Sequence, residues 1–222
     1  IVVSVDKVLK IPDHMSFAEG AAVPMAMLTA YDALINHSPL PEVGTVVVTA
    51  CTGAVGIAAL QMARRKGLRV IGTTRSHNKK SLVESFGVEA LVYSDPVDLK
   101  EKLMTKVGGN GIDYVFDPVG GATASQLLAF LNYNGSYLLY GSMDASPFAS
   151  PPNFLFHQLK LHGYVVLRNL ADPKKMQAVW SEILPLIETK EVHVPVHKTF
   201  AFDKVADAHR EMERHEHFGK II

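Results

Sequence analysis

The stretch of residues 45–63 constrains the fold most, because it has the pattern of a buried strand, a tight turn and a helix. Residues 46–48 are all valine, and an apolar β-branched run without alternation is typical of a parallel strand covered on both faces. The spacing Ala-x-x-Gly-x-x-Gly-x-x-Ala follows, with glycines at Gly53 and Gly56. Gly53 lets the backbone approach an anion closely, Gly56 lets the helix lie tight on the strand, and the helix start suits a pyrophosphate.

Two explanations of this glycine turn stay open from its own residues. It binds a dinucleotide, or it only packs a helix tightly on a strand, since Cys51 stands where the usual motif has its first glycine. Ligands of parallel sheets bind beyond the carboxyl ends of the strands, where bulky side chains would block a long cofactor. The expected strand ends are small, glycine-rich or hydroxyl-bearing, which favours a ligand over ordinary turn chemistry. They are residues 50–56, 74–79, 117–120 and 140–142.

The residues after the next strand indicate which dinucleotide binds. That strand, residues 69–74, ends without an acidic residue, whereas an NAD site places Asp or Glu there for the ribose hydroxyls. Arg75, Ser76, Lys79 and Lys80 follow instead. A cationic, hydroxyl-bearing cluster suits a 2′-phosphate and predicts NADPH as the cofactor. The alternative is a solvated helix start that carries ordinary surface charges.

Composition excludes several classes of protein. A chain of 222 residues suffices for one full α/β domain, and 22 basic residues balance 22 acidic ones. This balance argues against nucleic acid or an anionic membrane as the main partner. We find no apolar run that could span a bilayer and no signal-peptide pattern. A single cysteine rules out an intrachain disulfide and fits a reducing compartment, so we expect a cytoplasmic protein.

Strands alternate with helices along most of the chain, which predicts an α/β fold with a doubly wound parallel sheet. The expected strands are residues 45–48, 69–74, 90–93, 112–117, 136–140 and 159–167. We expect a helix over residues 21–35, broken at Pro24, and a long amphipathic helix over residues 173–188. The last segment differs, with strands at 196–200 and 218–222 around a helix at 203–214.

These motifs resemble the cofactor-binding half of the medium-chain dehydrogenases/reductases. Within that superfamily, the chain is most similar to the zinc-free quinone oxidoreductases and the 2-enoyl-thioester reductases. The matching stretches are residues 28–31, 50–59, 70–73, 117–121, 140–141, 159–164 and 218–221. The stretch 159–164 favours the enoyl reductases. Together these stretches span nearly all of the chain, so the resemblance is specific at the level of the superfamily.

The resemblance implies where the cofactor lies. Lys79 would hold the 2′-phosphate, and Tyr93 would lie by the adenine, although Ser94 occupies the position of the family's tyrosine. Thr29 and the strand end that starts at Tyr140 would lie near the nicotinamide. The expected cofactor-binding residues are Thr29, Thr52, Gly53, Ala54, Val55, Gly56, Thr74, Arg75, Ser76, Lys79, Tyr93, Asp117, Val119, Gly120, Tyr140, Gly141, Ser142 and Lys220.

The resemblance further implies a two-domain enzyme. Its GroES-like, β-rich catalytic domain would be formed mainly by a portion upstream of Ile1. Residues 1–20 and 192–222 would be short remnants of that domain, around a Rossmann domain at residues 21–191 that binds NADP. In this superfamily two edge strands pair across a homodimer, which implies a homodimer contact along the stretch from Leu161 to Val166.

The implied chemistry is hydride transfer from the nicotinamide to a quinone or an α,β-unsaturated carbonyl such as an enoyl thioester. We assign no catalytic residue, because the proton donor of enoyl reductases comes from the catalytic domain. The alternative is a non-catalytic module that only binds or senses NADPH. A methyltransferase also has a turn after its first strand, but the cationic cluster after the second strand argues against it.

A metal site is not expected. A catalytic zinc needs three protein ligands, commonly including cysteine, and Cys51 lies in the glycine turn as a small packing residue. His193 with His197 and His215 with His217 are the pairs that invite a metal interpretation. The second pair follows a charged helix end, where basic residues interact favourably with the helix dipole. We therefore interpret these histidines without a metal.

Overall fold

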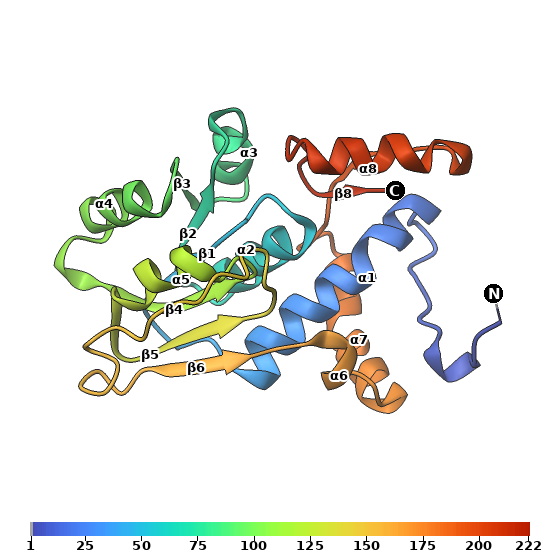
Figure 1. The fold of residues 1–222 in the computed structure, drawn as a ribbon. Helices are drawn as coiled ribbons and strands as arrows, with labels where there is room; N and C mark the ends of the chain where they lie inside the picture. The colour runs from blue at the N-terminus through green and yellow to red at the C-terminus, as the bar shows by residue number, and fades with distance from the viewer. Residues whose placement is uncertain (1) are drawn as a thin grey trace.

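A parallel sheet of six strands forms the centre of the computed structural model, which describes residues 2–222 (Figure 1). The strand order is β3-β2-β1-β4-β5-β6, and all neighbours in it are parallel. The chain runs outward from β1 to β3 and then returns to the other side of β1, so the order reverses between β1 and β4. The predicted doubly wound sheet is confirmed. The strands are β1 (Thr45–Val48), β2 (Arg69–Thr74), β3 (Glu89–Val92), β4 (Ile112–Asp117), β5 (Leu131–Leu139) and β6 (Lys160–Gly163).

Helices cover both faces of this sheet (Figure 1). One hydrophobic cluster joins the sheet to α1, α2 and α7, and a second joins it to α4 and α5. Val46, Val47 and Val48 are fully buried between these layers, as their unbroken apolar run predicts. The helices are α1 (Phe17–Tyr31), α2 (Ala54–Arg65), α3 (Lys80–Glu84), α4 (Pro96–Val107), α5 (Gly121–Leu128), α6 (Val166–Asn169), α7 (Pro173–Glu188) and α8 (Val205–Glu213).

The first helix differs from the sequence prediction at Pro24. We expected a break there, but α1 runs through the proline without interruption. Its start is fixed by Ser16, whose hydroxyl accepts from the Glu19 N–H while the Glu19 carboxylate accepts from the Ser16 N–H at 2.8 Å. Buried residues on both sides of Pro24 hold the helix against the core, and this packing outweighs the backbone hydrogen bond that the proline cannot make. A π-helical turn, Asp32–His37, then ends the segment.

The edge strand β6 is shorter than the expected strand of residues 159–167. It ends at Gly163, and α6 begins at Val166. The Tyr164 N–H still donates to the carbonyl of Leu139 in β5 at 2.9 Å, while its buried side chain donates its hydroxyl to a carboxylate oxygen of Asp32 at 2.9 Å. The strand end thus coincides with a side-chain contact to a residue far away in the sequence.

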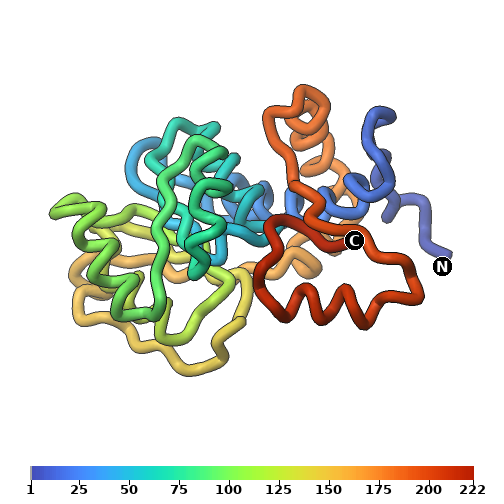
Figure 2. The backbone as a smooth tube through the Cα atoms, turned by 90° about the horizontal axis from the view of Figure 1, so that it is seen from above, coloured from blue at the N-terminus to red at the C-terminus, as the bar shows by residue number. Residues whose placement is uncertain are grey.

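The C-terminal segment forms a separate small sheet. Its two parallel strands, β7 (Val196–Lys198) and β8 (Lys220–Ile221), enclose α8 in the sequence. Figure 2 shows this red segment folding back, so that it ends on the same side of the molecule as the first described residues. Among residues 2–222, no helix combines the length and the apolar character that crossing a bilayer requires.

Candidate functional site

The turn between β1 and α2 lies at the carboxyl edge of the sheet, next to the point where the strand order reverses. Ala50 adopts a left-handed backbone with φ of 44°, and its carbonyl accepts from the Gly53 N–H at 3.1 Å. The Cys51 N–H donates to the carbonyl of Thr73 in β2 at 3.2 Å. These bonds fix the turn so that α2 starts directly above the edge of β1.

The two glycines of the turn have different roles. A Cβ on Gly56 would lie 2.7 Å from the Cα of Cys51 and 2.8 Å from the carbonyl oxygen of Ala50, so only glycine fits there. A Cβ on Gly53 would meet only that same oxygen, at 3.6 Å. No side chain caps the start of α2 at Gly53. Gly56 therefore allows the close packing, whereas Gly53 leaves open space beside the positive end of a helix dipole.

The C-terminal segment lies along this turn. Gly219 forms an isolated parallel bridge with Gly53, and its N–H donates to the carbonyl of Thr52 at 2.9 Å. This contact brings Lys220, the first residue of β8, to the glycine turn. The sequence suggested Lys220 only through the family resemblance. No local sequence pattern predicts the contact, because the two paired glycines lie far apart in the chain.

The cationic cluster after β2 divides into buried and exposed members. Lys79 is only 6% exposed, and its ammonium donates to the carbonyl of His215 at 2.5 Å. Burial lowers the pKa of Lys79, and the nearby carboxylate of Glu216 opposes this shift. Arg75 is exposed, and Lys80 points to Glu84 with 3.8 Å between ammonium and carboxylate. The structure thus sets Lys79 apart as a buried cation at the strand end.

The hydroxyls beside this cluster are held by the backbone. Thr74 is buried at the end of β2, and its hydroxyl oxygen accepts from the Ser76 N–H at 3.2 Å. The Tyr93 N–H donates to the Thr74 carbonyl at 3.1 Å, which keeps Tyr93 beside the same strand end. Burial raises the pKa of the Tyr93 phenol, and the Arg75 cation is the main opposing influence. Thr74, Arg75 and Tyr93 therefore share one corner of the sheet edge.

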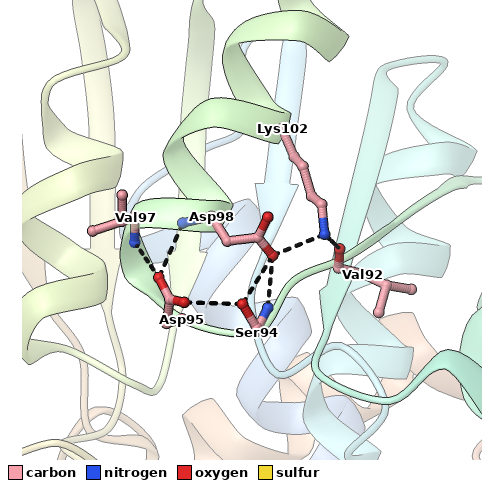
Figure 3. Close-up of polar contacts among 6 residues, drawn as sticks. All are labelled: Val92, Ser94, Asp95, Val97, Asp98 and Lys102. Atoms are coloured by element: carbon pink, nitrogen blue, oxygen red, sulfur yellow. Dashed lines mark hydrogen bonds and ion pairs between the residues drawn. The ribbon is translucent and has the colours of Figure 1, made fainter.

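The hydroxyl of Ser94 bonds to the carboxylates at the start of α4 (Figure 3). Its hydroxyl donates to Asp95 at 2.9 Å and to Asp98 at 3.2 Å, while the Asp95 carboxylate accepts from the N–H groups of Val97 and Asp98. Asp98 also accepts from Lys102 at 2.8 Å. This network caps the start of α4. Ser94 is thus committed to the helix cap, and Tyr93 supplies the aromatic ring at this strand end.

Asp117 organises the loop after β4. Its buried carboxylate accepts from the N–H groups of Val119 at 3.0 Å and Gly120 at 2.7 Å. The hydroxyls of Thr49 and Tyr137 donate to the same carboxylate. Burial raises the pKa of the Tyr137 phenol, and the Asp117 charge adds to the shift, so Tyr137 stays a donor. Two hydroxyls, one just after β1 and one in β5, and two N–H groups of the loop therefore hold one carboxylate.

The end of β5 packs on this loop. The Tyr140 ring stacks on Phe116 with 4.1 Å between ring centroids, and the Tyr140 N–H donates to the Asp117 carbonyl at 2.9 Å. A Cβ on Gly141 would lie 2.9 Å from the Pro118 carbonyl oxygen, so glycine allows the approach. Ser142 is exposed at the outer end of the loop. The structure brings the expected residues of these two strand ends together.

Thr29 lies apart from these loops in the sequence and is buried within α1. Its hydroxyl donates to the carbonyl of Met25 at 2.6 Å, one turn earlier in the helix. The expected position of Thr29 near a nicotinamide stays a prediction. In the part of the chain that the structure describes, no group of three His, Cys, Asp or Glu side chains is placed to hold a metal ion.

Comparison with known proteins identifies the family. Residues 54–189, more than half of the chain, match the zinc-binding dehydrogenase family. The chain belongs to this family. The match begins at the first residue of α2, directly after the glycine turn, and reaches past the end of α7. The resemblance to medium-chain dehydrogenases/reductases that the sequence motifs indicated is thereby confirmed.

Two relatives of this chain differ in how much of their own length it covers. A highly reducing polyketide synthase of Didymella fabae is 29% identical, over 97% of this chain and 12% of the relative. A quinone oxidoreductase of Pongo abelii is 26% identical, over 91% of this chain and 60% of the relative. The chain thus spans a small part of the long synthase and less than two thirds of the shorter enzyme.

Two solved structures share the fold. The mycobacterial protein Rv1454c, solved in complex with NADPH, has a TM-score of 0.88 at 24% identity, over 98% of this chain and 67% of that one. CurK enoyl reductase has a TM-score of 0.85 at 25% identity, over 99% of this chain and 66% of that one. The Rossmann-type arrangement inferred from the sequence is the arrangement of these proteins.

Proposed function

We propose that this chain is the cofactor-binding part of an NADPH-dependent oxidoreductase. The observation that carries the proposal is the pairing of an uncapped helix start at Gly53 with a buried cation, Lys79, at the end of the neighbouring strand. A pyrophosphate fits the first and a 2′-phosphate the second. The NADPH complex of the mycobacterial structure supports this choice of cofactor.

We assign each strand end to a different part of this cofactor. The open space at Gly53, which a Cβ would fill, suits the pyrophosphate together with Thr52 and the helix start at Ala54, Val55 and Gly56. Thr74, Arg75, Ser76 and Lys79 suit the 2′-phosphate, with Tyr93 on the adenine side and Lys220 beside the glycine turn. The loops at Asp117, Val119, Gly120, Tyr140, Gly141 and Ser142, together with Thr29, suit the nicotinamide half.

The bound cofactor would supply a hydride, and the acceptor would be a quinone or an α,β-unsaturated carbonyl such as an enoyl thioester. A relative that is a quinone oxidoreductase and a neighbour that is an enoyl reductase support these two acceptor classes. The contribution of this chain is to orient the cofactor, through the loop that Asp117 fixes. The proton donor would come from a catalytic domain.

We also propose that residues 1–20 and 192–222 belong to that catalytic domain, around a cofactor-binding domain at 21–191. Large apolar side chains in both segments are uncovered within the described chain: Phe17 is 93% exposed and Phe202 is 98% exposed. A further domain packed on both segments would bury them.

A homodimer through the edge strand is part of the same proposal. β6 has no neighbour on its outer side in the described sheet, so its backbone groups are open to a second copy. Leu161 in this strand is 46% exposed, and Val165 just after it is 52% exposed. We further propose a cytoplasmic location, because a chain with a single cysteine forms no intrachain disulfide and fits a reducing compartment.

Removing the proposed phosphate ligands tests the choice of cofactor. Lys79→Ala or Arg75→Ala should weaken NADPH binding about tenfold or more, because a charge-assisted hydrogen bond contributes about 1.5–3 kcal/mol. NADH binding should hardly change. Lys80→Ala is the matched control, since this neighbouring lysine is exposed and paired with Glu84. Equal weakening of both cofactors in calorimetric titrations would show that the 2′-phosphate does not bind here.

A steady-state assay of the full-length protein tests the reaction. We expect NADPH to be oxidised when quinones or enoyl thioesters are supplied, and NADH to be a poorer donor. A protein that binds NADPH tightly but oxidises it with neither acceptor class would instead be a non-catalytic module. A protein that binds neither dinucleotide would refute the proposed function as a whole.

A further inference from the structure

The segment before β8 crosses the end of β2, where the proposed phosphate site lies. Two contacts hold it there: the Lys79 ammonium donates to the His215 carbonyl at 2.5 Å, and the Gly219 N–H donates to the Thr52 carbonyl at 2.9 Å. His217 stands between these contacts in the sequence. Its position is therefore fixed from both sides, against the same corner of the sheet edge as Lys79.

The His217 imidazole is left with an unused polar atom. Its Nδ1 is buried and has no hydrogen-bond partner within residues 2–222. Burial lowers the pKa of His217, and the nearby cation of Lys79 is the next largest cause. His197 and His215 act in the same direction, while the Glu211 carboxylate opposes them. The ring is therefore neutral at pH 7 when no anion is present.

Charged groups of both signs surround His217, namely the cations of Lys79 and Arg75 and the carboxylates of Glu211 and Glu216. The His197 ring lies edge-on, with 6.3 Å between ring centroids, and its Nε2 is 3.5 Å from a Glu211 carboxylate oxygen. Lys79 has Arg75 as a further cation and Glu216 as a nearby carboxylate. The hydrogen bond described for Lys79 ends on a backbone carbonyl, which leaves this buried ammonium without a directly bonded anion. An anion that enters this corner would thus change the field at His217.

We propose that His217 is a proton-dependent binding residue for the 2′-phosphate of NADPH, and that it takes up a proton when the phosphate binds beside Lys79. The inference rests on the proposed function. A phosphate dianion at Lys79 would offset the cation that now disfavours the imidazolium, and it would offer the protonated ring a hydrogen-bond acceptor. The proton moves from solvent or buffer to the imidazole, and no covalent bond changes.

This proposal fixes the sign of the pH dependence. The complex holds the extra proton and the free protein does not, so NADPH affinity should rise as the pH falls toward the pKa of the free imidazole. Below that pKa both states hold the imidazole proton, so the histidine adds no further pH dependence. The phosphate itself has a second pKa of about 6, and binding to cations drives it to lose a proton. A phosphate without a titrating partner would therefore give the opposite sign.

Isothermal titration calorimetry at pH 7 in two buffers of different ionisation enthalpy measures the proton directly. The wild-type protein should take up roughly half a proton to one proton per NADPH bound and none with NADH. His217→Asn should abolish this uptake and weaken NADPH binding about three- to tenfold, while NADH binding stays the same. His209→Asn is the matched control, because His209 is exposed on α8 in the same segment.

The outcomes distinguish proton uptake by His217 from the binding of NADPH itself. NADPH that binds with net proton release, or with uptake unchanged in His217→Asn, would overturn this inference and leave the proposed cofactor standing. Failure of NADPH and NADH to bind would overturn both. The comparison of the two cofactors on the wild-type protein needs no variant, so net proton release with NADPH would overturn the inference even where His217→Asn fails to fold. Uptake that persists in His217→Asn but disappears in His197→Gln would assign the proton to His197.

Discussion

Replacing Asp117 with alanine should lower the free energy of unfolding by about 3–5 kcal/mol, the range expected when one partner of a buried polar network is removed. The change leaves two hydroxyls and two N–H groups without their acceptor inside the core. Urea unfolding followed by the fluorescence of the buried Trp180 would measure the loss. NADPH binding should weaken as well, because the loop to Gly120 loses its anchor.

Two further variants show whether the network or the volume matters. Tyr137→Phe removes a single donor and keeps the ring, so it should cost about 1 kcal/mol. Asp203→Ala removes an exposed carboxylate and should change the free energy of unfolding by less than about 0.5 kcal/mol. An Asp117→Ala protein as stable as the Asp203→Ala protein would contradict the role of Asp117 as the centre of this network.

Replacing each glycine of the turn after β1 with alanine should affect different properties: Gly56→Ala the stability of the fold, and Gly53→Ala mainly cofactor binding. Gly56→Ala forces a methyl group against the backbone of Cys51 and Ala50, which cannot move aside as a flexible side chain could. We expect a loss of about 3 kcal/mol in the free energy of unfolding, at the upper end of the range for overpacking. Cofactor binding should be lost with the local structure.

Gly53→Ala should instead leave the fold nearly intact, because its methyl group would meet only one oxygen at 3.6 Å. The free energy of unfolding should change by less than about 1 kcal/mol. NADPH and NADH should both bind more than about tenfold more weakly, since the methyl group occupies the space proposed for the pyrophosphate they share. Gly109→Ala, with nothing within 4 Å of the added methyl group, is the control. Tight NADPH binding by Gly53→Ala would place the pyrophosphate elsewhere.

The sequence is most informative where structure is decided by neighbours in the chain. The run of valines, the turn and the small residues of α2 form one continuous unit, so the strand, the helix and the direction of the sheet edge could all be predicted. The cationic cluster after β2 could be predicted for the same reason, since Arg75 and Lys79 follow the strand closely in the sequence. Local spacing could not show that Lys79 is buried while Lys80 is exposed.

The sequence is least informative where a distant residue decides. Tyr164 continues an apolar run that predicts a strand, yet β6 ends at Gly163 and the Tyr164 hydroxyl bonds to the distant Asp32. Pro24 reads as a helix break, yet the packing of α1 on the core keeps the helix continuous. The histidines before Gly219 read as a helix end, and only the fold brings them to Lys79. Each of these cases depends on a contact that no periodicity encodes.

The bridge between Gly53 and Gly219 has a consequence for how the protein is made. A growing polypeptide leaves the ribosome with its earlier residues first, so the central sheet can assemble while the partner of Gly53 is still unsynthesised. The glycine turn, which we propose binds the nucleotide, would gain its contact with Gly219 only afterwards. A dinucleotide at the proposed site would then close on a sheet that has already formed and could not serve as a template for that sheet.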